Sequence, residues 1–183
     1  SLEGAAKCSD CAAGKSQPDS EQGDCDECLA GTYSSGKATS CTNCPGGQYS
    51  EINSATVCST CPLGTFSVEK STSCTDCSSG TFASSAGQSS CDECAVGRFS
   101  NAGASLCTIC SAGKFTGATG TTACENCPIG TMSEEEATEC EDCDPGTYAE
   151  VEQSTRCASC VAGKYSLAKA SECVACDFGK FAG

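Results

Sequence analysis

The sequence predicts a small, disulfide-rich, all-β fold with little regular secondary structure, arranged as a linear, solenoid-like rod. Three observations support this prediction. The 183 residues include 22 cysteines, the composition of a chain held together by cross-links. Leu, Ile, Val and Phe together number only 20 against a formal net charge of −14, so an ordinary hydrophobic core is out of reach. The cysteines also recur at regular spacing from one end of the chain to the other.

The repeat is defined by CxxC pairs, whose first cysteines are spaced alternately 17 and 16 residues apart. There are eleven such pairs, beginning at Cys8, Cys25, Cys41, Cys58, Cys74, Cys91, Cys107, Cys124, Cys140, Cys157 and Cys173. The true period is therefore a double unit of 33 residues. We interpret residues 1–183 as a single continuous array of about eleven repeats. The array begins and ends inside the pattern, which indicates a segment of a longer chain or polymer.

Each repeat contains a second motif after its CxxC pair. A glycine stands three residues after the second cysteine, and in nearly every repeat an aromatic residue follows two positions later, as in Gly64-Thr65-Phe66-Ser67. Such a recurring glycine predicts a positive φ or a close approach by the next repeat. The alternation around Phe66 predicts a short strand, and the polar stretch beyond it predicts a turn. Because so short a hairpin is not stable alone, we expect the aromatics to stack on neighbouring disulfides as a thin core.

The chain resembles a known class of extracellular repeat. Segments such as Cys44-Pro45-Gly46-Gly47-Gln48-Tyr49-Ser50, followed by the next CxxC, are similar to ephrin-receptor-like cysteine-rich repeats and to the first half of tumour-necrosis-factor-receptor modules. Cysteine spacing alone does not fix connectivity. The resemblance implies that the second cysteine of each pair bonds to the first cysteine of the next. The implied bridges are Cys11–Cys25, Cys28–Cys41, Cys44–Cys58, Cys61–Cys74, Cys77–Cys91, Cys94–Cys107, Cys110–Cys124, Cys127–Cys140, Cys143–Cys157 and Cys160–Cys173. Cys8 and Cys176 would then pair outside this segment.

The cysteine content also indicates where the protein works. In the chain-entropy model each disulfide that closes a loop of about 15 residues stabilises the fold by about 3 kcal/mol, so ten could replace a core. They require an oxidising compartment, which predicts an extracellular or cell-surface location. The excess of 24 Asp and Glu over 10 Lys and Arg argues against nucleic acid as a partner. No run of 18 apolar residues is present, so we expect no membrane insertion in this segment.

Catalytic and metal-binding functions fit the sequence poorly. A redox enzyme needs one CxxC in an α/β fold, whereas this chain has eleven equivalent copies. Two neighbouring pairs could supply four thiolates to zinc, but eleven pairs cannot be used two at a time. The acidic run Glu134–Glu136 has no calcium-loop motif around it, and a solvated surface is the simpler interpretation. We also expect so thin a rod to offer no cleft for catalytic carboxylates. We therefore predict no catalytic residues, no metal site and no cofactor.

A hydroxyl residue recurs two positions before the first cysteine of most pairs. One interpretation is a hydroxyl that hydrogen-bonds across the hairpin. The other is O-glycosylation of a surface stalk, while the absence of an NxS or NxT sequence excludes N-linked glycans from this stretch. The candidate O-glycosylation sites are Thr39, Thr56, Thr72, Thr122, Thr138 and Thr155.

Apolar residues follow the second cysteine in the shorter, 16-residue units. They are Leu29, Leu63, Val96, Ile129 and Val161. If successive repeats alternate in orientation, these five line one edge. They would then either pack on the neighbouring repeat's disulfide or form a lateral contact with another copy of the chain.

These observations favour a structural role over a catalytic one. We predict a structural subunit of an extracellular fibre or cell-surface filament, stiffened by disulfides, self-associating and carrying O-linked glycans. The alternative is a rod-like ectodomain of a receptor or adhesin that binds a protein ligand. Such a binding site should appear as an irregular repeat, whereas a fibre requires every repeat alike, and the near-uniform units favour the fibre.

Overall fold

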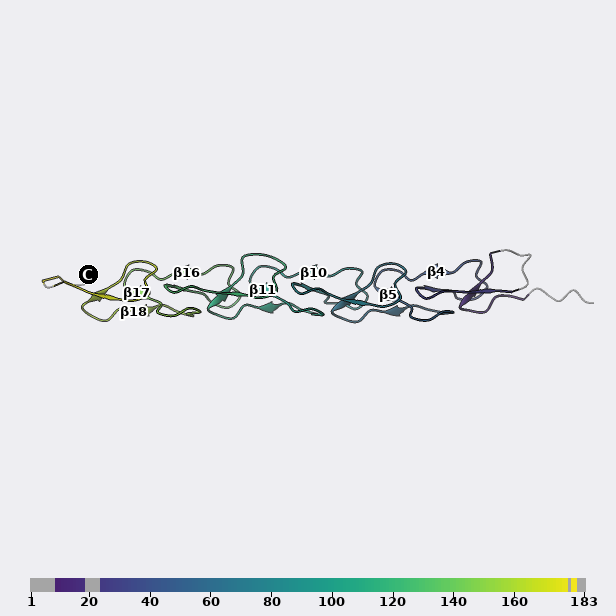
Figure 1. Cartoon of the computed structure of the whole chain (residues 1–183), viewed down its shortest axis with the longest axis horizontal. Coiled ribbons are helices and arrows are strands. Elements are labelled where there is room, and N and C mark those ends of the chain that lie inside the picture. Colours follow the sequence, from purple (N-terminus) through teal and green to yellow (C-terminus); the bar gives the residue numbers. More distant parts are fainter. Residues whose placement is uncertain (1–8, 19–23, 178, 181–183) are drawn as a thin grey trace, which may run out of the picture. The chain divides into compact units, whose positions relative to one another are not determined.

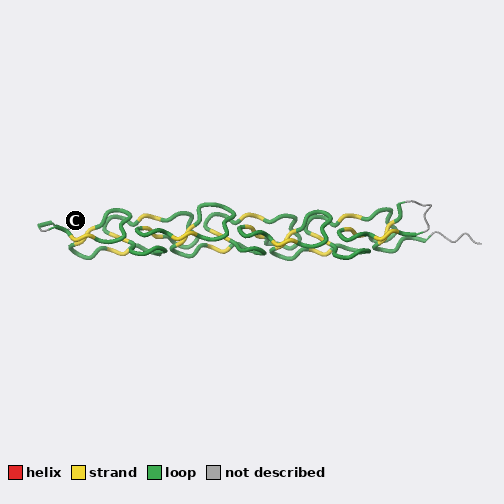
Figure 2. The backbone as a smooth tube through the Cα atoms, in the orientation of Figure 1, coloured by secondary structure: helices red, strands yellow, loops and turns green. Residues whose placement is uncertain are grey.

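The structure is a computed structural model that describes residues 9–18, 24–177 and 179–180. Within these ranges it contains no helix, and its regular secondary structure consists of twenty strands of two residues each. The strands pair in order as ten antiparallel hairpins. Figure 2 shows them as short yellow segments in a chain made mostly of turns and loops. The predicted all-β, disulfide-rich repeat architecture is therefore confirmed.

The hairpins follow one another along the chain (Figure 1). In the first five the paired strands are β1 (Lys15–Ser16) with β2 (Asp26–Glu27), β3 (Thr32–Tyr33) with β4 (Thr42–Asn43), β5 (Gln48–Tyr49) with β6 (Ser59–Thr60), β7 (Thr65–Phe66) with β8 (Thr75–Asp76), and β9 (Thr81–Phe82) with β10 (Asp92–Glu93). In the next five they are β11 (Arg98–Phe99) with β12 (Thr108–Ile109), β13 (Lys114–Phe115) with β14 (Glu125–Asn126), β15 (Thr131–Met132) with β16 (Glu141–Asp142), β17 (Thr147–Tyr148) with β18 (Ala158–Ser159), and β19 (Lys164–Tyr165) with β20 (Val174–Ala175).

The register of each hairpin shows what the CxxC motif does. In β3 and β4, Thr32 lies opposite Asn43 and Tyr33 lies opposite Thr42. Thr42 and Asn43 are the two residues between Cys41 and Cys44, so the interior of the motif is a strand. The strand places the two cysteines of a pair in different disulfides. This geometry is unlike the start of a helix on which a redox-active CxxC depends.

Ten disulfides close the hairpins. Each joins the second cysteine of one pair to the first cysteine of the next, at a sequence separation of 13 or 14 residues, which is the pairing that the family resemblance implies. Cys176 is a free, partly exposed cysteine. Cys8 lies outside the described residues.

A tight turn connects each disulfide to the first strand of its hairpin. In the turn at 29–32, the Thr32 amide donates to the Leu29 carbonyl at 3.0 Å, and Gly31 has a φ of +82°. A positive φ at the third residue is what a type II turn requires, and glycine adopts it without strain. A Cβ on Gly31 would also lie 2.4 Å from the carbonyl oxygen of Lys70, two repeats further along. The predicted positive φ is therefore confirmed, whereas the close approach comes from the repeat two further along and not, as predicted, from the next one.

The core consists of disulfide sulfur and small residues. The second cysteines of the pairs from Cys28 to Cys143 are almost completely buried, and the residue after each strand aromatic is also buried, for example Ser67 at 2% exposure and Ala83 at 0%. The aromatics are not buried: Phe66 and Phe99 are half-buried, and Tyr165 is 45% exposed. The aromatics are therefore not part of the fully buried core, and their stacking on neighbouring disulfides stays a prediction.

Hydrogen bonds join each repeat to the next. Between the repeats that begin at Cys25 and Cys41, the amide of Gly31 donates to the carbonyl of Ser50 at 2.9 Å, that of Ser34 to Ala55 at 3.1 Å, and that of Ser54 to Cys28 at 2.6 Å. The same three kinds of bond recur along the chain. Because only backbone groups form these three bonds, the exposed side chains can vary without loss of the bonds between repeats.

A side-chain hydroxyl explains why the period is 33 residues. In every shorter unit the buried serine after the aromatic position donates its Oγ to a carbonyl 19 residues earlier, at 2.8–3.0 Å. The five serines are Ser34, Ser67, Ser100, Ser133 and Ser166. In the longer units from Cys41 onward the same position is occupied by Ser50, Ala83, Thr116 and Ala149, and none of these makes that bond. Successive junctions are therefore of two alternating types.

The chain divides into two compact units. One contains residues 1–77 and 83–91, and the other contains residues 78–82 and 92–183. Each is built from the same hairpin, turn and disulfide.

Candidate association surface

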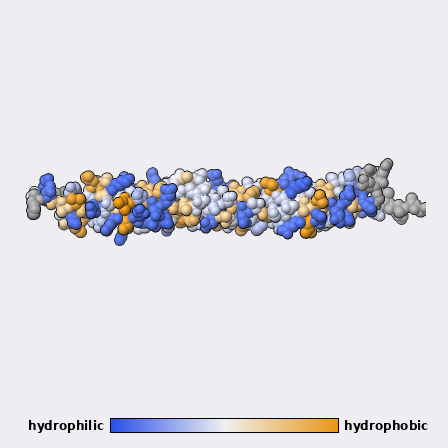
Figure 3. Space-filling view, in the orientation of Figure 1, coloured by the Kyte–Doolittle hydropathy of each residue, from blue (hydrophilic) through white to orange (hydrophobic). Residues whose placement is uncertain are grey.

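The branched aliphatic side chains all lie on the surface. Among the described residues, every Leu, Ile and Val is exposed, thirteen in total, from Ile109 at 37% and Val96 at 39% to Leu167 at 73%. A folded protein normally buries such residues first. Here the disulfides and small residues fill the interior, so these side chains contribute little to folding. Figure 3 shows orange apolar residues scattered among hydrophilic ones on the face in view.

The five candidate lateral-contact residues are all in the turns that precede the hairpins. Leu63, Val96 and Ile129 are the second residues of their turns, whereas Leu29 and Val161 are the first residues. Their exposed fractions are 67% for Leu29, 53% for Leu63, 39% for Val96, 50% for Ile129 and 66% for Val161. The alternative, that they pack on the neighbouring repeat's disulfide, stays a prediction. Their part in a lateral contact remains a proposal.

A hollow lies beside one of these residues. It has a volume of about 280 Å³ and is lined by Tyr148, Glu150, Ser159, Val161, Lys164, Glu172 and Cys173. The expectation that the chain offers no cleft is therefore wrong for this hairpin. The lining mixes carboxylates, one amine and two larger apolar groups, and the chain contains no histidine.

The six candidate glycosylation threonines are exposed. Among the described residues, none of their hydroxyls has a hydrogen-bond partner, so the alternative prediction of a hydroxyl bonded across the hairpin is wrong. Each threonine follows a residue whose backbone carbonyl joins two repeats: the carbonyl of Ala55, before Thr56, accepts from Ser34, and that of Ala137, before Thr138, accepts from Thr116 at 3.2 Å. The backbone is anchored beside the threonine while its side chain meets solvent.

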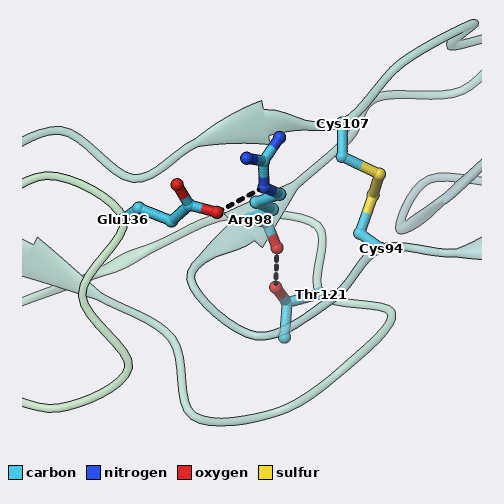
Figure 4. A network of polar contacts seen from close by, with 5 residues as sticks. All are labelled: Cys94, Arg98, Cys107, Thr121 and Glu136. Carbon is cyan, nitrogen blue, oxygen red and sulfur yellow. Dashed lines mark hydrogen bonds and ion pairs between the residues drawn. A yellow bond between two sulfur atoms is a disulfide. The ribbon is translucent and has the colours of Figure 1, made fainter.

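Polar side chains add a second layer of contacts between repeats. Arg98 and Glu136 form an ion pair of 2.6 Å between Nε and Oε1, and the Thr121 hydroxyl donates to the Arg98 carbonyl at 3.1 Å (Figure 4). These three residues belong to three successive repeats. The side chains of the pair are 39% and 46% exposed, so the pair adds little to stability. Its effect is on the local position of the loop that carries Glu136.

Among the described residues, no group of three or more His, Cys, Asp or Glu side chains is placed to hold a metal ion. The cysteines of the ten bridges are oxidised, so their sulfurs are not thiolate ligands. The described part of the chain also has no helix long and apolar enough to cross a membrane.

Comparison with protein families gives one clear match. Four overlapping segments of the chain match the family described as tyrosine-protein kinase ephrin type A/B receptor-like: residues 31–69, 64–99, 97–132 and 130–166. Each match spans about two repeats, and together they cover residues 31–166. No curated protein matches the chain.

Proposed function

The chain belongs to the ephrin type A/B receptor-like family of non-catalytic, disulfide-rich repeats, and on this premise we propose that it is a structural subunit of an extracellular fibre or cell-surface filament. The disulfides and the family together point to an extracellular domain. In the proposed filament, copies of the chain associate laterally and carry O-linked glycans. No enzymatic activity is part of this proposal.

The observation that carries this function is the exposure of the recurring turn residues Leu29, Leu63, Val96, Ile129 and Val161. The core needs cysteine, glycine, serine and alanine, so selection for folding alone would leave polar residues at these surface positions. Apolar side chains mark an association site where they form one continuous surface, and in this proposal the turn residues form such a surface when two copies of the chain meet. Since they occur in repeat after repeat, the contact is better suited to a partner with the same repeat than to a compact ligand.

The backbone bonds that recur at junctions of both types support the same proposal. The carbonyl of Cys44 accepts from Lys70 at 2.8 Å, and the equivalent bond from Lys169 to Cys143 has the same length. A load along the chain is therefore shared among equivalent junctions, each backed by a covalent bridge. This is the property that a fibre subunit requires.

The net charge sets the condition for assembly. Copies that each carry a formal charge of −14 repel one another at low ionic strength. Apolar turns would then meet only where salt or another cation screens the carboxylates. The proposed filament should therefore form more readily at high salt than at low salt.

The test compares two triple variants by electron microscopy and sedimentation. Leu63→Ser, Val96→Ser and Ile129→Ser together remove the turn residues, while the control replaces the similarly exposed Val68, Val151 and Leu167 by Ser. We expect bundles of the first variant to loosen and those of the control to persist, with both proteins folded. Unchanged bundling in the first variant would refute the lateral contact, and discrete particles of the unsubstituted protein would refute the fibre.

The second candidate function is a receptor or adhesin ectodomain that binds a protein ligand. The family match favours it, because the family is described by its likeness to receptors. It predicts discrete particles at every concentration and salt, and saturable binding of a ligand at one place on the chain. The microscopy described above distinguishes the two functions.

A further inference from the structure

We propose that Thr39, Thr56, Thr72, Thr122, Thr138 and Thr155 are the acceptor sites for O-linked sugars, and that the threonines of the tight turns are not. The inference rests on the extracellular location in the proposed function, where such modification takes place. The sites are identified by comparing the exposure and the hydrogen bonds of the hydroxyl groups.

The fold separates its hydroxyl residues into classes. One class is engaged: Ser67 and Ser133 are buried and bond the preceding repeat, and Thr65 donates its Oγ1 to the Pro62 carbonyl at 2.8 Å within the turn. Thr81 makes the equivalent turn bond to Ser78 at 2.8 Å. The six proposed acceptors form another class, because they are exposed and their hydroxyls have no partner in the described part of the chain. Their oxygens are available to an enzyme.

The recurrence of a hydroxyl at the acceptor position needs an explanation other than folding. From residue 39 onward, the position two before the first cysteine is Thr or Ser in every repeat. Its neighbours are not restricted in this way: the preceding residue is Ala, Ser, Gln or Thr, and the following residue ranges from Ala123 and Leu106 to charged residues such as Arg156 and Glu172. The hydroxyl is thus the feature retained at this position.

The strand positions inside the CxxC motifs differ in this respect. Thr42 and Thr75 are exposed there, but the equivalent residue in other repeats is Asp92, Ala158 or Val174. No hydroxyl is retained at that position, and each of these residues stands next to a disulfide-bonded cysteine in a paired strand. The residues inside the CxxC motif therefore form a strand of the hairpin, whereas the acceptor position lies in the loop before that strand.

The backbone geometry presents the six threonines in the same way each time. The carbonyl of Thr121, before Thr122, accepts from the Ser100 amide at 3.4 Å, and that of Ser154, before Thr155, accepts from the Ser133 amide at 3.3 Å. The anchored peptide fixes the main chain, while the next side chain extends into solvent. A transferase can therefore reach the hydroxyl without opening the fold.

The reaction is a simple group transfer. The threonine Oγ1 attacks the anomeric carbon of a sugar nucleotide, a C–O bond forms, and the bond between that carbon and the phosphate oxygen breaks. The nucleoside diphosphate leaves, and the hydroxyl proton passes to a base of the transferase. The product is uncharged at the modified side chain, so it adds nothing to the net charge of −14.

The experiment measures the intact mass of the protein isolated in its extracellular form and then locates each modification by fragmentation of its peptides. We expect mass increments in hexose or pentose steps, located on the six threonines. Thr56→Val and Thr138→Val should each remove one glycan. The matched control Thr65→Val, which loses a bonded hydroxyl instead, should remove none, and the free-thiol count should be the same in all variants.

Three results would overturn the inference: a bare polypeptide mass, glycans on Thr65, or phosphate in place of sugar. Electron microscopy of the same samples separates this inference from the proposed function. Filaments of an unmodified protein would refute the glycan sites and leave the fibre standing. Glycosylated but discrete particles would refute the fibre and leave the sites standing.

Discussion

Replacing Gly113 by Ala tests the close packing between alternate repeats. Gly113 has a φ of +83°, and a Cβ at this position would lie 2.1 Å from the carbonyl oxygen of Gln153. Gly120 also has a positive φ, of +67°, but a Cβ at this position would lie no closer than 3.5 Å to its nearest described neighbour, the side chain of Glu93. The two substitutions therefore impose a similar backbone strain, and only Gly113→Ala adds a collision.

The expected magnitudes follow from this difference. A left-handed backbone costs alanine about 1–2 kcal/mol, part of which is offset because alanine also restricts the unfolded chain. Gly120→Ala should therefore cost about 1 kcal/mol. In Gly113→Ala the Gln153 carbonyl must also retreat by about 1 Å, which disturbs the 2.9 Å bond from the Gln153 amide to Cys127. We expect a total of about 2–4 kcal/mol.

Amide hydrogen exchange is the appropriate assay, because it reports local opening while the disulfides stay intact. A tenfold change in protection corresponds to about 1.4 kcal/mol. Exchange at residue 113 and at Gln153 should accelerate by about 30-fold to 1000-fold in Gly113→Ala, against about fivefold at residue 120 in Gly120→Ala. Equal acceleration in the two variants would refute the argument from close packing.

Three further predictions concern single contacts and assembly. Ser100→Ala should cost about 1 kcal/mol, measured by exchange in the neighbouring hairpin, because it removes the bond to the Thr81 carbonyl; no effect would mean that the alternating junctions have another cause. Glu136→Gln should cost less than about 1 kcal/mol, and the difference from the unsubstituted protein should vanish in about 1 M salt, in a denaturation series at two salt concentrations. Self-association should increase as the pH falls towards the isoelectric point of about 4.2, where the net charge approaches zero, in light-scattering measurements; association that weakens on acidification would contradict the role given to charge repulsion.

Cysteine and glycine spacing predicts much of this fold. The CxxC pairs and the motif Gly64-Thr65-Phe66 lead directly to short hairpins in a repeat array, because each residue type has a local geometric requirement. The position of the aromatics could not be predicted in the same way. Phe66 is half-buried because the separation between hairpins is set by backbone bonds and cystines, which are tertiary features.

The origin of the 33-residue period was also hidden from the sequence. Ser67 in a shorter unit and Ser50 in a longer one are the same residue at the same place in the motif, yet only Ser67 reaches a carbonyl of the preceding repeat. For the threonines, the sequence shows the recurring position but not the hydrogen bonding. Thr56 could be identified as a recurring hydroxyl, but whether it bonds across the hairpin depends on the direction of its side chain.

The central claim is that cystines replace the hydrophobic core, and a free-thiol count of the denatured, unreduced protein tests it most directly. Ten disulfides use twenty of the 22 cysteines, Cys176 is free, and Cys8 lies outside the described residues, so the account predicts no more than two thiols per chain. A count near 22, accompanied by bound zinc, would contradict it and would mean that the cysteines are metal ligands.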